Sequence, residues 1–209
     1  ARIYNSIDGN IYKPNNEFDE SEDGNGESKY VNAELQFLGY SFKNYSAIFE
    51  NITTDDTTDD EDKERLIKII EEISTANTTH FNINSYINYL AVANSISLLD
   101  TYSFSGKNYY LYEERNYLTF MPYDLNMSYV NFVDEPGNSI TFDILMDNFN
   151  EDPKYCVRPL TCLIRSNEKY YQKYKKQIKK FLEKNISNNN IYNKIDKYGE
   201  LISDYLTND

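Results

Sequence analysis

The sequence is poor in the residues that build disulfide-bonded or zinc-bound domains. It contains a single histidine and two cysteines among 209 residues, and it also has no tryptophan. Two cysteines are too few for a disulfide-built scaffold, and His80 has no cysteine near it in sequence to complete a zinc site. The chain also lacks an apolar run of about 18 residues, so we expect no membrane span.

Positive charge is scarce as well. The chain carries 21 Lys and Arg against 34 Asp and Glu, which gives a net charge of −13. Because binding to a nucleic-acid backbone needs clustered Lys and Arg, we expect no nucleic-acid partner. The one basic run extends from Lys169 to Lys184 on a segment with helical spacing, where a solvated helix face is the simpler interpretation.

Apolar residues are sufficient for one packed domain, since they make up 40% of the chain. Tyrosine, with 21 copies, supplies much of the apolar bulk. Its ring packs in a core while its hydroxyl group finds water or a hydrogen-bond partner.

The first part of the chain is predicted to be β-rich. Ile11–Lys13 and Leu35–Phe37 have the composition of strand cores, and polar, acidic residues over 51–62 form a linker. We therefore expect a partial small lobe over residues 1–55 and a helical large lobe over residues 56–209.

Helical spacing of apolar residues predicts four helices in the second part. They carry the stripes Leu66 to Ile73, Ile87 to Leu98, Tyr170 to Phe181 and Ile191 to Tyr205, and the second is expected to run from about Ser85 to Leu99. A β-hairpin with strands 108–112 and 117–121 is embedded among them. A turn centred between Glu114 and Arg115 would pair Asn108 with Met121. The fold class is therefore α+β.

The two cysteines, Cys156 and Cys162, are six residues apart, so a local disulfide is an open alternative. A bridge requires Cα atoms within about 7 Å. Two positions six apart on one regular helix are about 9 Å apart along its axis, which would exclude the bridge.

Three polar residues follow the chain order of a phosphoryl-transfer centre. A catalytic Asp, an Asn metal ligand, a hairpin and a second metal-binding Asp occur in that order in protein kinases. Here Asp100 is predicted to end the second helix, Asn108 opens the hairpin and Asp124 follows its second strand. Taken on spacing alone, ordinary turn residues are the better explanation of these positions.

Longer segments resemble the CotH (spore coat protein H) family of atypical protein-kinase-like domains. The main similarity lies in Lys107-Asn-Tyr-Tyr-Leu-Tyr112 and Phe120-Met-Pro-Tyr-Asp-Leu-Asn-Met-Ser128, preceded by Leu99-Asp-Thr-Tyr-Ser103. Weaker similarity lies in Asp8 to Pro14 and in Arg158-Pro-Leu160. The resemblance extends in order from Asp8 to about Tyr174.

The resemblance implies an atypical protein-kinase-like fold that binds ATP with Mg²⁺ and phosphorylates Ser or Thr of a protein substrate. Carried over by position, Asp100 would be the catalytic carboxylate, Asn108 and Asp124 the metal ligands, and Lys13 a cation near the phosphates. Members occur in bacterial spore coats, and related domains are carried by secreted and cellulosome-associated proteins. An extracellular, cell-surface or spore-surface location is therefore expected.

The sequence also departs from the family pattern. Tyr123 stands where the family usually has Trp, and no Gly-rich phosphate loop is present. The basic residue expected two positions after Glu50 is also absent, and the neighbouring position is Asn51. The chain shows no signal peptide and is expected to be a trimmed piece of a longer protein. These departures keep open an alternative function, a non-catalytic kinase-like binding or adhesion module.

Overall fold

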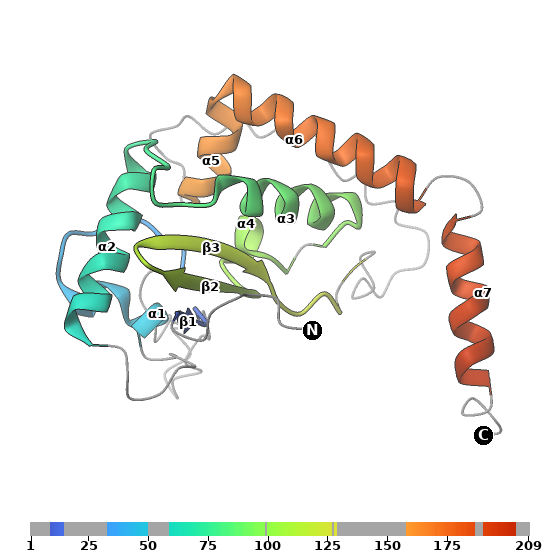
Figure 1. The fold of residues 1–209 in the computed structure, drawn as a ribbon, viewed down its shortest axis with the longest axis horizontal. Coiled ribbons are helices and arrows are strands. Elements are labelled where there is room, and N and C mark those ends of the chain that lie inside the picture. Colours follow the sequence, from blue (N-terminus) through green and yellow to red (C-terminus); the bar gives the residue numbers. More distant parts are fainter. Residues whose placement is uncertain are drawn as a thin grey trace, which may run out of the picture.

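The computed structural model describes residues 9–14, 33–49, 59–98, 100–126, 128, 158–186 and 190–203. In these ranges three strands combine with helices of very different length (Figure 1). In chain order the elements are β1 (Asn10–Tyr12), η1 (Phe42–Tyr45), α1 (Ser46–Phe49), α2 (Asp60–Ser74), α3 (Ile83–Ser95), α4 (Tyr102–Ser105), β2 (Tyr109–Glu114), β3 (Tyr117–Pro122), α5 (Pro159–Ser166), α6 (Glu168–Phe181), η4 (Leu182–Ile186) and α7 (Asn190–Ile202).

The three strands form one antiparallel sheet in the order β1-β2-β3. The hairpin predicted from the sequence is confirmed, but its predicted register is wrong. Met121 pairs with Tyr110 rather than with Asn108, because the turn residues are Arg115 and Asn116. Both have positive φ, 50° and 62°, as a two-residue type I′ turn requires.

The sheet contains strands from both of the lobes predicted from the sequence. Tyr12 of β1 pairs with Leu111 of β2, and Asn10 pairs with Glu113. The division into lobes over residues 1–55 and 56–209 stays a prediction, and strands from both ranges lie in this sheet.

Helix α3 connects the sheet to the remaining helices. Phe120 of β3 donates its backbone N–H to Ser85 Oγ at the start of α3, at 3.0 Å. On its other side α3 runs beside α6 (Figure 1), where the Asn94 amide donates to the buried hydroxyl of Tyr174 at 2.5 Å. The long side chains of α3 thus fill the space between a sheet and a helix.

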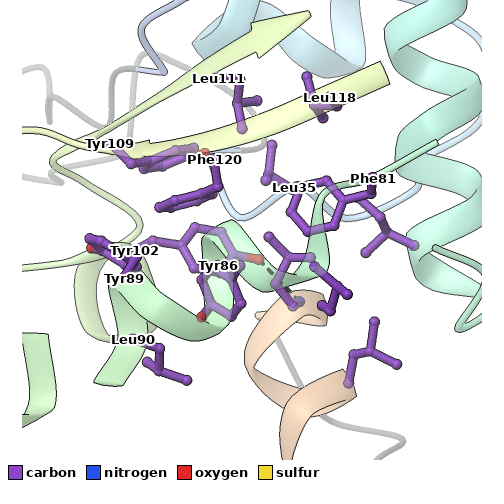
Figure 2. Packing of buried hydrophobic residues seen from close by; sticks show 14 of the residues in the cluster. Leu35, Phe81, Tyr86, Tyr89, Leu90, Tyr102, Tyr109, Leu111, Leu118 and Phe120 are labelled. Atoms are coloured by element: carbon purple, nitrogen blue, oxygen red, sulfur yellow. Dashed lines mark hydrogen bonds between the residues drawn. The ribbon is translucent and has the colours of Figure 1, made fainter. Parts of the chain in front are cut away.

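Aromatic rings form the centre of this core (Figure 2). Tyr109 of β2 stacks on Phe120 of β3, with ring centroids 4.8 Å apart and an interplanar angle of 7°. Tyr86 of α3 meets Phe120 edge-on at 5.0 Å, and Tyr102 of α4 meets Tyr109 in the same way at 5.2 Å. Such pairs add to the stabilisation from burial alone, so the core fixes α3 and α4 against the hairpin.

Two sequence predictions on local structure are wrong. Leu35–Phe37 is not a strand: Leu35 is buried with a φ of 60°, which is incompatible with an extended chain. The second helix ends at Ser95 rather than near Leu99, because Ser97 has a φ of 50° and breaks the helical path. Asp100 therefore lies in the connection between α3 and α4 and does not end a helix.

The observed fold class is α+β, as predicted, with a small antiparallel sheet among helices. None of the described helices is both long and apolar enough to cross a membrane. Cys162 on α5 is disulfide-bonded. Cys156, the other cysteine of the sequence, lies outside the described residues.

Candidate functional site

Three of the four candidate site residues follow or precede strands at the same end of the sheet. Lys13 comes directly after β1, Asn108 directly before β2, and Asp124 two residues after β3. In an antiparallel sheet the end of one strand lies beside the beginning of its neighbour. Residues distant in sequence are thus brought to one edge by the order of the strands.

Asn108 joins Asp100 to this end of the sheet. The Asn108 amide group donates to the Asp100 carboxylate, with Nδ2 2.8 Å from Oδ2, and to the backbone oxygen of Asp100 at 3.0 Å. Both residues are partly buried. With its nitrogen committed to Asp100, the amide oxygen of Asn108 is the atom suited to a cation.

A backbone hydrogen bond links the residue before Asp124 to Asn108. Tyr123 donates its backbone N–H to the Asn108 carbonyl at 3.2 Å, which continues the hairpin by one step beyond β3. Asp124 is exposed, has a φ of 48°, and accepts the Asn126 N–H at Oδ1 at 3.3 Å. The chain therefore turns at Asp124, two residues after the end of β3.

Lys13 reaches the same edge through aromatic contacts. Its Nζ atom lies 4.5 Å from the centroid of the Tyr123 ring, which in turn meets Tyr110 edge-on at 4.8 Å. A cation above an aromatic face is attracted by the ring quadrupole. Lys13 thus contacts the residue directly before Asp124.

The segment between Asp100 and Asn108 is held by Arg158, which directly precedes α5, and by Glu34. Arg158 donates from Nε to the Tyr102 carbonyl at 3.0 Å and from Nη2 to the Phe104 carbonyl at 3.3 Å. Its Nη1 atom lies 3.6 Å from Glu34 Oε1. The Tyr102 hydroxyl group donates to the Glu34 carbonyl at 2.8 Å. One guanidinium therefore contacts two carbonyls of the short helix α4, which separates the two site residues.

Tyr89 is an uncharged, buried tyrosine close enough to Asp100 to interact with its charge. Burial raises the pKa of Tyr89, and the negative charge of Asp100 raises it further. Its hydroxyl oxygen accepts the backbone N–H of Tyr102 at 3.2 Å. At neutral pH this group stays protonated, so it adds no charge beside the candidate catalytic carboxylate.

The donor atoms at this edge suit a hard cation. Asp100, Asn108 and Asp124 offer carboxylate and amide oxygens, which are the ligands that Mg²⁺ prefers. Within the described ranges, no three His, Cys, Asp or Glu side chains gather as a metal-binding group. The candidate set contains only two such side chains and an amide, so it fits an ion that completes its shell with water and phosphate oxygens.

Sequence reasoning found the four candidates but missed how the segment between them is held. The sequence points to Arg158 only through the Arg-Pro-Leu similarity, although an arginine before a helix-starting proline is a usable signal in an acidic chain. The contacts of Tyr102 left no such signal, because its partners are backbone atoms of residues 34 and 160.

Comparison with known families gives one finding. A family model described as CotH kinase protein matches residues 1–209. No curated protein and no solved structure gives a match.

Proposed function

The chain belongs to the CotH kinase protein family, and from this membership we propose that it transfers the γ-phosphoryl group of ATP to Ser or Thr hydroxyls of protein substrates. The proposal includes an atypical protein-kinase-like fold for the whole domain, with Mg²⁺ as its metal ion. A protein substrate agrees with the family description, and a location outside the cell or on a cell or spore surface is part of the same proposal.

The observation that carries the proposal is the contact between Asn108 and Asp100 at the edge of the sheet where Asp124 follows β3. In the proposed reaction Asp100 orients the substrate hydroxyl group and accepts its proton as the oxygen–phosphorus bond forms. The bond from the γ-phosphorus to the bridging oxygen breaks, and ADP leaves with that oxygen.

The other candidates bind and orient the nucleotide. The Asn108 amide oxygen and the Asp124 carboxylate would hold Mg²⁺, which when bound neutralises charge on the phosphates. Lys13 would place its ammonium group near the same phosphates from the end of β1. Asn108 also fixes the rotamer of Asp100 through its amide N–H, so one side chain serves both the metal and the catalytic carboxylate.

The first test is phosphate transfer by the full chain and two site variants. We expect Asp100→Asn to lower the transfer rate by about 10²- to 10⁴-fold with nucleotide binding retained, because only proton acceptance is lost. Asp124→Ala should abolish transfer and weaken Mg²⁺-dependent ATP binding, because a metal ligand is removed. Transfer of labelled phosphate and ATP titration with and without Mg²⁺ measure the two effects.

The matched control is Asp196→Ala, which removes an exposed carboxylate from α7, far along the chain from the site. It should leave both measurements unchanged. Wild-type rates in the Asp124→Ala protein would refute the assignment of the metal site.

A second function is favoured by one specific feature. The sequence has no Gly-rich loop to cover the phosphates, and a binding or adhesion module would not need one. This alternative predicts that the wild-type protein binds neither ATP nor Mg²⁺-ATP, and that Asp100→Asn leaves partner binding intact. The nucleotide titration above therefore separates the two functions.

A further inference from the structure

Helix α6 and the turn after it carry an unusual stripe of lysines. Residues 168–184 contain seven lysines and two glutamates, a local charge of +5 in a chain of net charge −13. Five of the lysines follow one another at intervals of four, three, four and four residues, so they share one face of the helix. This stripe consists of Lys169, Lys173, Lys176, Lys180 and Lys184, all of them exposed.

Among the described residues, few acidic side chains lie close enough to pair with the stripe. Within the part of the chain that the structure describes, Lys179–Glu183 is the one ion pair of this segment, at 3.8 Å, and it lies beside the stripe. Like charges four residues apart on a helix destabilise it. Helix α2 shows the usual solution, in which Lys63 pairs with Asp60 and Arg65 with Asp62.

The helix dipole does not account for the stripe either. Cations are favourable in the last turn of a helix, which explains Lys180, but they are unfavourable in the first turn. Lys169 is the second residue of α6 and Lys173 lies only one turn further along. Solubility of a chain that is already strongly negative needs no such stripe.

A groove lies beside the C-terminal half of the stripe, between α3 and α6. It has a volume of about 260 Å³. Its polar lining includes Lys180, Lys184, Gln177 and Asn88, and its apolar lining includes Val92 and Phe181. This volume is just below the usual range of small-molecule pockets, about 300–1,000 Å³, and it is large enough for one apolar side chain with polar groups around it.

From the stripe and the groove together, we propose that this face is a docking site for an acidic, extended polypeptide segment with one large apolar side chain. From Lys169 to Lys184 the stripe spans about 22 Å at the helical rise per residue, which is the length of about seven residues of extended chain. Asp and Glu side chains of the segment would lie along the lysines, and its apolar side chain would enter the groove.

A segment bound at this face would contact side chains that pack close to the candidate site. Val92 and Phe181 also pack against the small cluster of Ala93, Ile96 and Leu98. Leu98 is two residues before Asp100. The proposal does not depend on the proposed kinase activity, since the interaction is measured by binding alone.

The test is fluorescence anisotropy of a labelled nine-residue peptide, rich in Asp and Glu with a central Leu, titrated with the full chain. We expect binding that weakens as salt concentration rises. Lys180→Glu with Lys184→Glu should lower the affinity by about tenfold, because two attractions become repulsions. A peptide with Ser in place of Leu should also bind about tenfold more weakly, because the groove then buries no apolar side chain.

The control pair is Lys43→Glu with Lys68→Glu, two exposed lysines outside the stripe that give the same change in net charge. It should change the affinity by less than about twofold. Should the charge-reversed pair lose its helical circular dichroism, Lys180→Gln with Lys184→Gln gives the same comparison without new charges.

Three results would overturn the proposal. They are absence of binding by the wild-type chain, equal losses in the two double variants, and single-stranded DNA or anionic vesicles binding at least as tightly as the peptide. The last result would identify the stripe as a general polyanion surface.

Discussion

Asn108 and Asp124, two of the four candidate site residues, have left-handed backbone conformations, with φ of 58° and 48°. For residues other than glycine this region costs about 1–2 kcal/mol, less for Asn and Asp, whose short polar side chains bond locally. Both conformations occur just outside strands, where the chain must leave the sheet abruptly. Positive φ also occurs away from the candidate site, at Ser97 and Arg115 for example, so it marks abrupt turns of the chain as well as site positions.

Arg158 provides a prediction at the residue scale. Arg158→Gln should lower the free energy of unfolding by about 1–3 kcal/mol, because two carbonyls of α4 lose a charged donor. It should also lower the rate of phosphate transfer more than it changes the KM for ATP, because the segment from Asp100 to Asn108 is no longer held. Chemical denaturation and steady-state kinetics measure these quantities.

Arg165 on α5 is the matched control for Arg158. Its guanidinium carbon lies 4.9 Å from the centroid of the Tyr171 ring, so Arg165→Gln should cost less than about 1 kcal/mol and leave the transfer rate unchanged. Arg158→Lys should recover part of the rate, since it restores a cation but not the two-pronged contact. Equal kinetic losses in the Arg158→Gln and Arg165→Gln proteins would contradict a positioning role for Arg158.

At the scale of single elements, the β2–β3 hairpin sets the geometry of the site. Its register decides which residues stand at the open end, since a shift by one residue moves each side chain to the opposite face. The turn at Arg115 and Asn116 therefore determines the position of Asn108 relative to Asp124. Arginine is a poor residue for a type I′ turn, because its Cβ atom is crowded at positive φ.

The turn gives a prediction on stability. Arg115→Gly should raise the free energy of unfolding by about 1 kcal/mol, because glycine adopts positive φ without strain. Arg115→Ala keeps the Cβ atom and the strain, so it should change stability by less than about 0.5 kcal/mol. Arg115 is 84% exposed and its nearest carboxylate is 4.0 Å away, so loss of its charge contributes little to either result. Equal effects of the two substitutions, measured by thermal unfolding, would show that the backbone at this position is not strained.

At the scale of the whole molecule, the core depends on buried tyrosines. Burial raises the pKa values of Tyr86, Tyr102 and Tyr109 well above the ordinary value of 10. Their hydroxyl groups have partners in the interior: Thr161 Oγ1, the Glu34 carbonyl and the Ala33 carbonyl, respectively. The neutral rings of these three tyrosines therefore pack in the core with their hydroxyl groups hydrogen-bonded.

These pKa values predict a loss of stability in alkali. A raised pKa in the folded state means that the unfolded chain releases its phenolic protons first as pH rises. The stabilisation is complete below pH 10 and falls above it, by about 1.4 kcal/mol per pH unit for each tyrosine that stays protonated only in the fold. Absorbance at about 295 nm should show exposed tyrosines ionising first and the buried ones ionising together with unfolding, followed by circular dichroism. Gradual ionisation of all tyrosines near pH 10, with the fold intact, would contradict this.

The sequence by itself determined the local elements. Helical spacing of apolar residues located α2, α3, α6 and α7, and the change to β-rich composition located the hairpin, because both signals depend on neighbours within a few residues. The four candidate site residues were also named from sequence, through chain order and resemblance. Their roles in chemistry stay predictions.

Tertiary structure decided everything that depends on distant partners. It set the hairpin register through two turn residues at positive φ, ended α3 at Ser95, two residues before the positive φ of Ser97, and held Leu35 in a buried, non-extended conformation. It also brought Lys13 to Tyr123 and Arg158 to the carbonyls of α4. These contacts join residues 54 to 110 positions apart, and no local pattern encodes them, because their energy comes from packing and charge that exist only after the sheet and helices have met.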